Sequence, residues 1–123
     1  MSNVFRDQAK FMNACGQTVG NRNTEQYAMY VKLIDEEVGE LHQAIVAGDL
    51  AEQLDALIDI MVVTVGAAQS LGVDSEGAWK EVMSTNFAKI DSLTGLVRKR
   101  EDGKVLKPVG WRAPELAKYI NKE

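Results

Sequence analysis

The sequence has little of the chemistry that builds disulfide-linked or zinc-bound folds. Its 123 residues include one cysteine, Cys15, and one histidine, His42. A single cysteine excludes an internal disulfide framework and a zinc site made of several thiolates. Nothing local pairs the cysteine with the histidine, so a catalytic thiol is not indicated either. We therefore expect Cys15 to be a plain small residue and His42 to be structural or interfacial.

Long uninterrupted apolar runs are also missing. The longest such stretch, residues 56–73, contains Asp59 and several small or polar residues, which favours a buried helix over a membrane span. The N-terminus lacks the basic, apolar and small-residue order of a secretory signal, so a cytoplasmic location is expected. A hydrophobic content of 46% in 123 residues predicts one soluble domain. This domain, residues 1–123, would consist of a core over 25–92 and an arm over 93–123.

Basic residues are absent from one long part of the chain. No Lys or Arg occurs in residues 33–79, whereas eight of the eighteen acids lie within residues 35–59. Residues 1–92 carry fourteen acids and six bases, and residues 93–123 carry four acids and eight bases. An acidic body argues against general duplex-DNA binding, which requires a positive face. We expect neither a nucleic-acid partner nor a membrane partner.

Apolar residues recur at helical spacing through most of the sequence, which predicts an all-α fold. The pattern indicates an antiparallel bundle of about four or five helices with an irregular basic C-terminal arm. The expected helices cover residues 4–14, 25–47, 50–71, 75–90 and a short segment from Pro114. Thr24 is the expected cap of the second helix, while Gly48 ends it and Asp49 caps the third. So short a connection makes these two helices antiparallel neighbours.

Acidic residues stand one turn apart on these two neighbouring helices. Glu36, Glu37 and Glu40 lie on the first, and Glu52 and Asp55 lie on the second. Mg²⁺ prefers oxygen ligands and commonly takes a few carboxylates together with water and substrate phosphate. The first three acids alone are also compatible with a solvated charged face.

Asp59 changes this balance in favour of a metal site. It is the only charged residue between Ala56 and Val73. An unpaired ionised carboxylate in so apolar a helix is costly, so it must be paired, protonated or metal-bound. We expect Mg²⁺ as the cofactor, with Mn²⁺ as the alternative.

The spacing Glu36-Glu37-x-x-Glu40, eleven residues, then Glu52-x-x-Asp55 resembles the signature of the MazG-like all-α nucleoside triphosphate pyrophosphohydrolases. Ser-Thr-Asn-Phe-Ala-Lys at 84–89 and Arg-Glu-Asp-Gly-Lys-Val-Leu-Lys at 100–107 resemble the phosphoribosyl-ATP pyrophosphohydrolase-like branch of that superfamily. The likeness extends over about residues 25–115.

The resemblance implies Mg²⁺-dependent hydrolysis of a nucleoside triphosphate between the α- and β-phosphates, giving monophosphate and pyrophosphate. The implied metal ligands are Glu37, Glu40, Glu52 and Asp55, and Glu36 would orient or deprotonate the attacking water. Asp59 would be a further ligand, an anchor behind the ligands or a contact to the nucleotide sugar. A pyrimidine deoxynucleotide such as dUTP is the substrate suggested by family analogy.

Residues beyond the acidic helices are candidates for substrate binding. Asn86 and Lys89 stand at i, i+3 near the end of the fourth helix, where they would meet phosphate or base or else cap carbonyls. The basic run of the arm could neutralise a triphosphate or simply be solvated; it comprises Arg98, Lys99, Arg100, Lys104 and Lys107. Trp111 could stack on a base, but aromatic residues in such an arm more often pin the arm to the body.

Two further interpretations remain open from the sequence. The acids could organise a non-catalytic metal-binding or assembly module, or the enzyme could hydrolyse phosphoribosyl-ATP itself. The large amount of apolar helix surface predicts a homo-oligomer, and family members are typically dimers or tetramers. We therefore expect a homodimer or homotetramer, in which the arm serves its own subunit or a partner.

Overall fold

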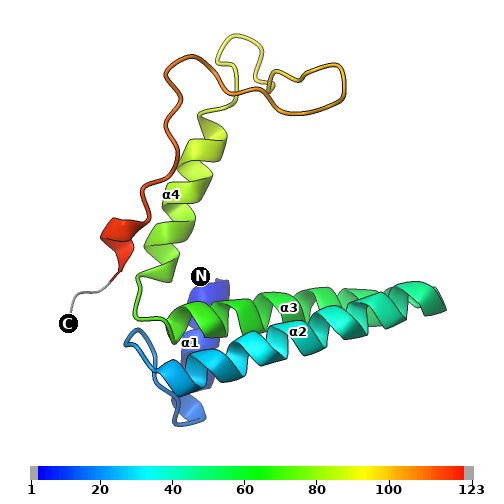
Figure 1. Ribbon diagram of the computed structural model, residues 1–123, viewed down its shortest axis with the longest axis vertical. Coiled ribbons are helices and arrows are strands. Elements are labelled where there is room, and N and C mark those ends of the chain that lie inside the picture. The colour runs from blue at the N-terminus through cyan, green and yellow to red at the C-terminus, as the bar shows by residue number, and fades with distance from the viewer. Residues whose placement is uncertain (1–2, 121–123) are drawn as a thin grey trace. The chain divides into compact units, whose positions relative to one another are not determined.

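The computed structural model describes residues 3–120, and its regular secondary structure is helical throughout this range (Figure 1). The predicted domain also includes residues 1–2, and the predicted arm also includes residues 121–123. Both segments lie outside the described residues. The elements are α1 (Val4–Ala14), α2 (Thr24–Ala47), α3 (Leu50–Gln69), α4 (Ser75–Phe87) and a 3₁₀ turn, η1 (Ala117–Tyr119). This confirms the all-α prediction. None of the described helices combines the length and apolar character needed to cross a bilayer.

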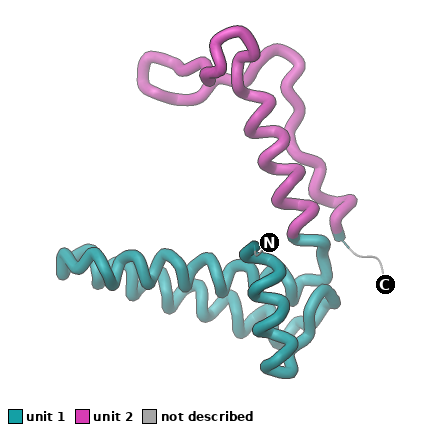
Figure 2. The backbone as a smooth tube through the Cα atoms, turned by 180° about the vertical axis from the view of Figure 1, so that it is seen from behind, with its two compact units in different colours: residues 1–75, 120–123 teal, residues 76–119 magenta. Residues whose placement is uncertain are grey.

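The described chain divides into two compact units (Figure 2). The first contains residues 3–75 together with Ile120, and the second contains residues 76–119. α1, α2 and α3 therefore belong to the first unit, whereas the second consists of most of α4 and the arm. The organisation of 1–123 as one domain stays a prediction.

Local capping explains where α2 and α3 begin and end. The Asn23 side chain accepts a hydrogen bond from Gln26 N at 3.1 Å, so Asn23 is the cap and the expected cap, Thr24, is the first helical residue. Gly48 adopts a left-handed conformation with φ 67°, and Asp49 Oδ1 accepts from Glu52 N at 3.1 Å. The two-residue connection makes α2 and α3 antiparallel and side by side (Figure 1), as predicted.

The core of the first unit lies at the end of the helix pair away from this turn. Met12, Tyr30 and Ala67 are buried there and come from α1, α2 and α3 respectively. A Cβ placed on Gly66 would lie 2.4 Å from Cε1 of the Tyr30 ring. The close approach of α2 and α3 therefore requires glycine at this position.

A polar network ties the loop between α1 and α2 to the same end. Gln26 Nε2 donates to Thr18 O at 2.7 Å and to Ser70 Oγ at 2.8 Å, while Thr18 N donates to Gln26 Oε1 at 2.9 Å. Apolar packing and hydrogen bonds thus both hold this end. The acidic residues lie on the remaining part of the helix pair, toward Gly48.

The second unit is organised around α4 and the Glu81 side chain. Glu81 accepts from Glu115 N at 3.0 Å and from the Tyr119 hydroxyl at 3.2 Å, and it pairs with Lys118 at 3.4 Å. These bonds hold the η1 region against α4, where a helix was expected from Pro114 and only the 3₁₀ turn forms. α4 itself ends at Phe87, earlier than the expected Ile90.

The arm folds back on itself over residues 98–106. Leu106 N donates to Arg98 O and Arg100 N donates to Lys104 O, both at 2.8 Å. The pairing of Lys99 with Val105 is an isolated bridge, so no regular strand forms in the described arm. The turn at residues 101–103 closes this small hairpin.

Candidate metal and catalytic site

Four carboxylates of the first unit influence one another electrostatically. Glu37 and Glu40 project from α2, and Asp55 and Asp59 project from α3. Three of them are predicted metal ligands, and Asp59 is the acid singled out by its apolar surroundings. The antiparallel helix pair therefore brings both halves of the acidic motif together. We call Glu37, Glu40, Asp55 and Asp59 the acidic group.

Glu37 is the member of the acidic group whose carboxyl is influenced by all three of the others. Burial raises the pKa of its carboxyl above the ordinary value of 4.5, and the contact with the Glu40 carboxylate raises it further. The negative charges of Asp59 and Asp55 act in the same direction. A carboxylate among like charges, partly removed from water, favours a proton or a cation.

Asp59 experiences the same environment from the α3 side. Burial raises the pKa of its carboxyl above 3.8, followed by the effects of the Asp55 and Glu40 charges. No Lys or Arg occurs within residues 33–79, so the parts of α2 and α3 that carry these acids contain no basic residue to relieve the repulsion. The sequence predicted that Asp59 needs a proton, an ion-pair partner or a metal. The charged neighbours that act on it are Asp55 and Glu40, which are both acidic.

One carboxylate oxygen of the acidic group is buried without a hydrogen-bond partner, and this bears on whether these residues suit a divalent cation. Glu37 Oε2 is inaccessible to solvent and has no hydrogen-bond partner among the described residues. A buried carboxylate oxygen without a donor is costly, and a bound cation would remove that cost. An all-oxygen, acid-rich donor set is also the one that Mg²⁺ and Mn²⁺ accept. The residues present therefore fit the expected metal.

The acidic group is not arranged as a closed cage. Among residues 3–120, no three acidic, histidine or cysteine side chains stand in positions that would already enclose an ion. Without an ion, the carboxylates repel one another and stay apart. Ion binding would therefore require their side chains to rotate toward the ion. Glu36 and Glu52 are exposed and are not among the carboxylates whose charges act on Glu37 or Asp59.

The predicted substrate-binding residues of α4 and the arm lie in the second unit. Lys89 Nζ donates to Asn86 Oδ1 at 3.1 Å. Trp111 Nε1 donates to Thr85 O at 2.7 Å, and the Lys89 ammonium lies 5.1 Å from the centroid of its ring. The indole is thus attached to the end of α4. This contact corresponds to the interpretation in which Trp111 pins the arm rather than stacks on a base.

Three of the basic arm residues predicted to meet the substrate differ in their contacts. The Arg100 guanidinium forms a two-pronged ion pair with Asp102, and Lys104 donates its backbone N–H to the same carboxylate at 3.1 Å. Lys107 Nζ lies 4.7 Å from the Trp111 ring centroid. Lys107 is therefore grouped with Lys89, whereas Arg100 is held within the hairpin turn.

Fold and site together define an all-helical protein whose paired helices present the acidic group, which forms no ion pair with a Lys or Arg among residues 3–120. Residues 13–86 match the model of the phosphoribosyl-ATP pyrophosphohydrolase family. The match covers more than half of the 123 residues, including both acidic helices. The chain therefore belongs to this family of pyrophosphohydrolases, which confirms the resemblance drawn from its motifs. Comparison with curated proteins gives no match.

Proposed function

We propose that this protein is a Mg²⁺-dependent nucleoside triphosphate pyrophosphohydrolase that cleaves between the α- and β-phosphates. The observation that carries the proposal is the solvent-inaccessible Glu37 Oε2, which lacks a hydrogen-bond donor in the middle of the acidic group. Membership in a pyrophosphohydrolase family supplies the reaction class. Mn²⁺ would substitute for Mg²⁺ because both accept hard oxygen ligands.

The acidic residues divide into ligands and a proton acceptor. Glu37, Glu40, Glu52 and Asp55 would hold the ion, which supplies Lewis-acid polarisation of a phosphoryl oxygen when bound. Hydrolysis adds one water across the α–β anhydride bond, so the water loses a proton as monophosphate and pyrophosphate form. Glu36, exposed and adjacent to Glu37, would accept that proton. Asp59 would orient the ligands through its electrostatic contacts with Asp55 and Glu40.

The substrate is proposed as a pyrimidine deoxynucleoside triphosphate, with dUTP first in the test panel. Asn86, Lys89 and Lys107 would contact its phosphates or base, and Arg100 and Lys104 would contribute positive charge from the arm. Phosphoribosyl-ATP is the second candidate because the matched family model carries that name. Both substrates release pyrophosphate, so one assay compares them directly.

The test is a panel of nucleotides incubated with the protein and Mg²⁺, with pyrophosphate and monophosphate both quantified. We expect Glu40→Gln or Asp55→Asn to lower turnover by about a hundredfold or more while circular dichroism remains helical. Asp35→Asn is the matched control: it removes one exposed acid of α2 outside the acidic group and should retain activity.

Three results would contradict the proposal. Unchanged turnover in Glu40→Gln and Asp55→Asn would remove the acidic group from the reaction. Mg²⁺ binding without release of pyrophosphate from any panel member would favour the non-catalytic metal-binding or assembly module instead. Release of inorganic phosphate alone would exclude cleavage between the α- and β-phosphates.

A further inference from the structure

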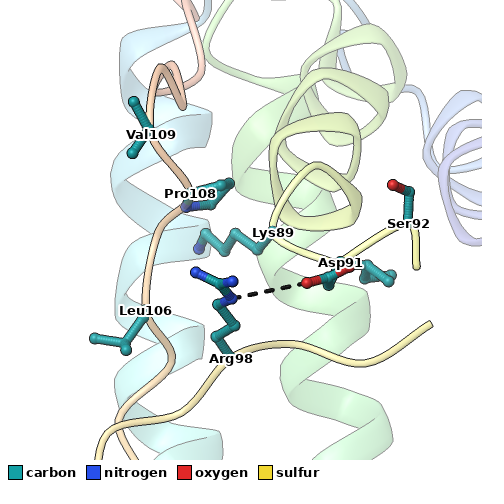
Figure 3. A pocket seen from close by; sticks show the side chains of 8 residues that line it. Lys89, Asp91, Ser92, Arg98, Leu106, Pro108 and Val109 are labelled. Atoms are coloured by element: carbon teal, nitrogen blue, oxygen red, sulfur yellow. Dashed lines mark ion pairs between the residues drawn. The ribbon is translucent and has the colours of Figure 1, made fainter. Parts of the chain in front are cut away.

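The second unit contains a cavity of about 350 Å³ that the acidic group does not use (Figure 3). Its charged walls come from Lys89, Asp91 and Arg98, and its apolar wall comes from Leu106, Pro108 and Val109. The volume is in the range of small-molecule sites, which combine apolar walls with a few charged groups. A ligand with one anionic end and one less polar part would match both walls.

The cavity holds more positive than negative charge. Figure 3 shows the charged ends of Lys89 and Arg98 directed toward one another across it. Lys89 donates to the neutral Asn86 side chain, and Arg98 Nε lies 3.7 Å from Asp91 Oδ2. That distance exceeds a direct hydrogen bond. Two cations therefore converge on a space in which only one, loosely paired carboxylate balances them.

Asp91 is fixed, whereas Arg98 can turn. The Asp91 carboxylate accepts a hydrogen bond from Leu93 N at 2.8 Å, and the backbone carbonyl of Asp91 accepts one from Gly95 N at 2.8 Å. The side chain of Arg98 is 76% exposed. The guanidinium can therefore exchange Asp91 for another anion while the carboxylate stays in place. Asp91 acts as an internal competitor for any anion that enters the cavity.

The geometry points to a binding site for a small organic phosphate. Lys89 and Arg98 contact the phosphate oxygens, for which a guanidinium fork and an ammonium are well suited. The organic part packs against Leu106, Pro108 and Val109. This site shares Lys89 with the proposed substrate contacts, but it goes beyond the proposed hydrolysis because it requires neither the metal nor the acidic group.

The test measures binding to the intact protein by titration calorimetry in EDTA, so that no divalent cation can hold phosphate at the acidic group. The probes are dUMP, inorganic phosphate and deoxyuridine. We expect dUMP to bind more tightly than inorganic phosphate, and deoxyuridine to bind weakly or not at all. Arg98→Gln should weaken dUMP binding by about tenfold, and Asp91→Asn should strengthen it by a few fold because a competing charge is removed.

Arg112→Gln is the matched control, since it removes an exposed arginine of the same arm that does not line the cavity. An equal loss in Arg112→Gln and Arg98→Gln would overturn the site in favour of general attraction to the basic arm. Weaker binding in Asp91→Asn would also overturn it, as would no dUMP binding to the wild-type protein. Equal affinities for dUMP and inorganic phosphate would overturn the role of the apolar wall. Because turnover is not measured, a failure of the proposed hydrolysis leaves this result intact.

Discussion

At the scale of single residues, Glu37 and Asp59 show how position rather than residue type changes the pKa of a carboxyl. Most helix carboxylates are solvated, but these two are partly buried beside other acids. Their charged forms destabilise the free protein, and a ligand that compensates the charge converts that cost into binding affinity. The same side chains would therefore be a liability for stability and the basis of the proposed function.

The raised pKa values predict how stability depends on pH without metal. Burial and neighbouring charges raise the pKa of Glu37 above 4.5 and of Asp59 above 3.8. The native state then keeps protons that the unfolded chain has released. The free energy of unfolding in EDTA therefore falls as pH rises from these ordinary values through the raised ones. Each group contributes at most about 1.4 kcal/mol per pH unit; thermal unfolding at successive pH values measures the slope.

Other acids of the chain do not mask this slope. The backbone N–H of Glu115 and then Lys118 lower the pKa of Glu81, and Arg100 lowers that of Asp102. Their stabilisation is present above the ordinary values and is lost as pH falls through the lowered ones. A slope in which stability falls as pH rises therefore has the sign expected of the acidic group, and the opposite sign to that expected of Glu81 and Asp102. The double variant Glu37→Gln/Asp59→Asn should flatten it, and a slope that persists there would assign it elsewhere.

The candidate site was only partly predictable at this scale. Asp59 stands out in the sequence because its apolar neighbours leave it no partner, and the structure gives it Asp55 and Glu40. The orphaned oxygen of Glu37 could not be foreseen, because it depends on side-chain rotation and not on spacing along a helix. Asp91 was missed for a similar reason: it pairs with an arginine seven residues away through a turn.

At the scale of elements, strong local signals located the helices well. α1 was predicted with its observed bounds, and the left-handed Gly48 followed by the Asp49 cap was read directly from the sequence. Asn23 and Thr24 are both good caps, so neighbouring contacts decided between them. Among the described residues after Pro114, bonds to Glu81 hold the chain against α4, and η1 is the helical element that forms there.

The contact between α2 and α3 gives a prediction about packing. Gly66→Ala would place a Cβ 2.4 Å from the ring of the buried Tyr30. We expect the free energy of unfolding to fall by about 1–3 kcal/mol because a packed aromatic ring must move. Chemical denaturation monitored by circular dichroism measures the change.

Gly39→Ala is the matched control for this substitution. It also replaces a helical glycine, but nothing lies within 4 Å of the added Cβ. Alanine should therefore stabilise α2 by about 0.5–1 kcal/mol through helix propensity alone. If both variants shifted stability in the same direction, the close approach of Tyr30 to Gly66 would not explain the glycine.

At the scale of the whole molecule, apolar side chains near the turn between α2 and α3 remain uncovered in the single chain. Val46 is 90% exposed, Leu50 79% and Leu54 61%. Both leucines lie in the first turns of α3, whereas Val65, near its other end, is buried. Large apolar side chains exposed in this number on one pair of helices are expected to lie in a contact between subunits. We therefore propose a homodimer or homotetramer that buries this end of the helix pair.

Light scattering coupled to gel filtration measures the assembly, and we expect a mass of two or four chains. Leu50→Glu/Leu54→Glu should shift it to one chain, because ionised side chains are costly in an apolar contact. The matched control is Leu93→Glu, which places the same charge on an exposed leucine of the other unit. A wild-type mass of one chain would refute the assembly, whereas dissociation caused only by Leu93→Glu would move the contact to the second unit.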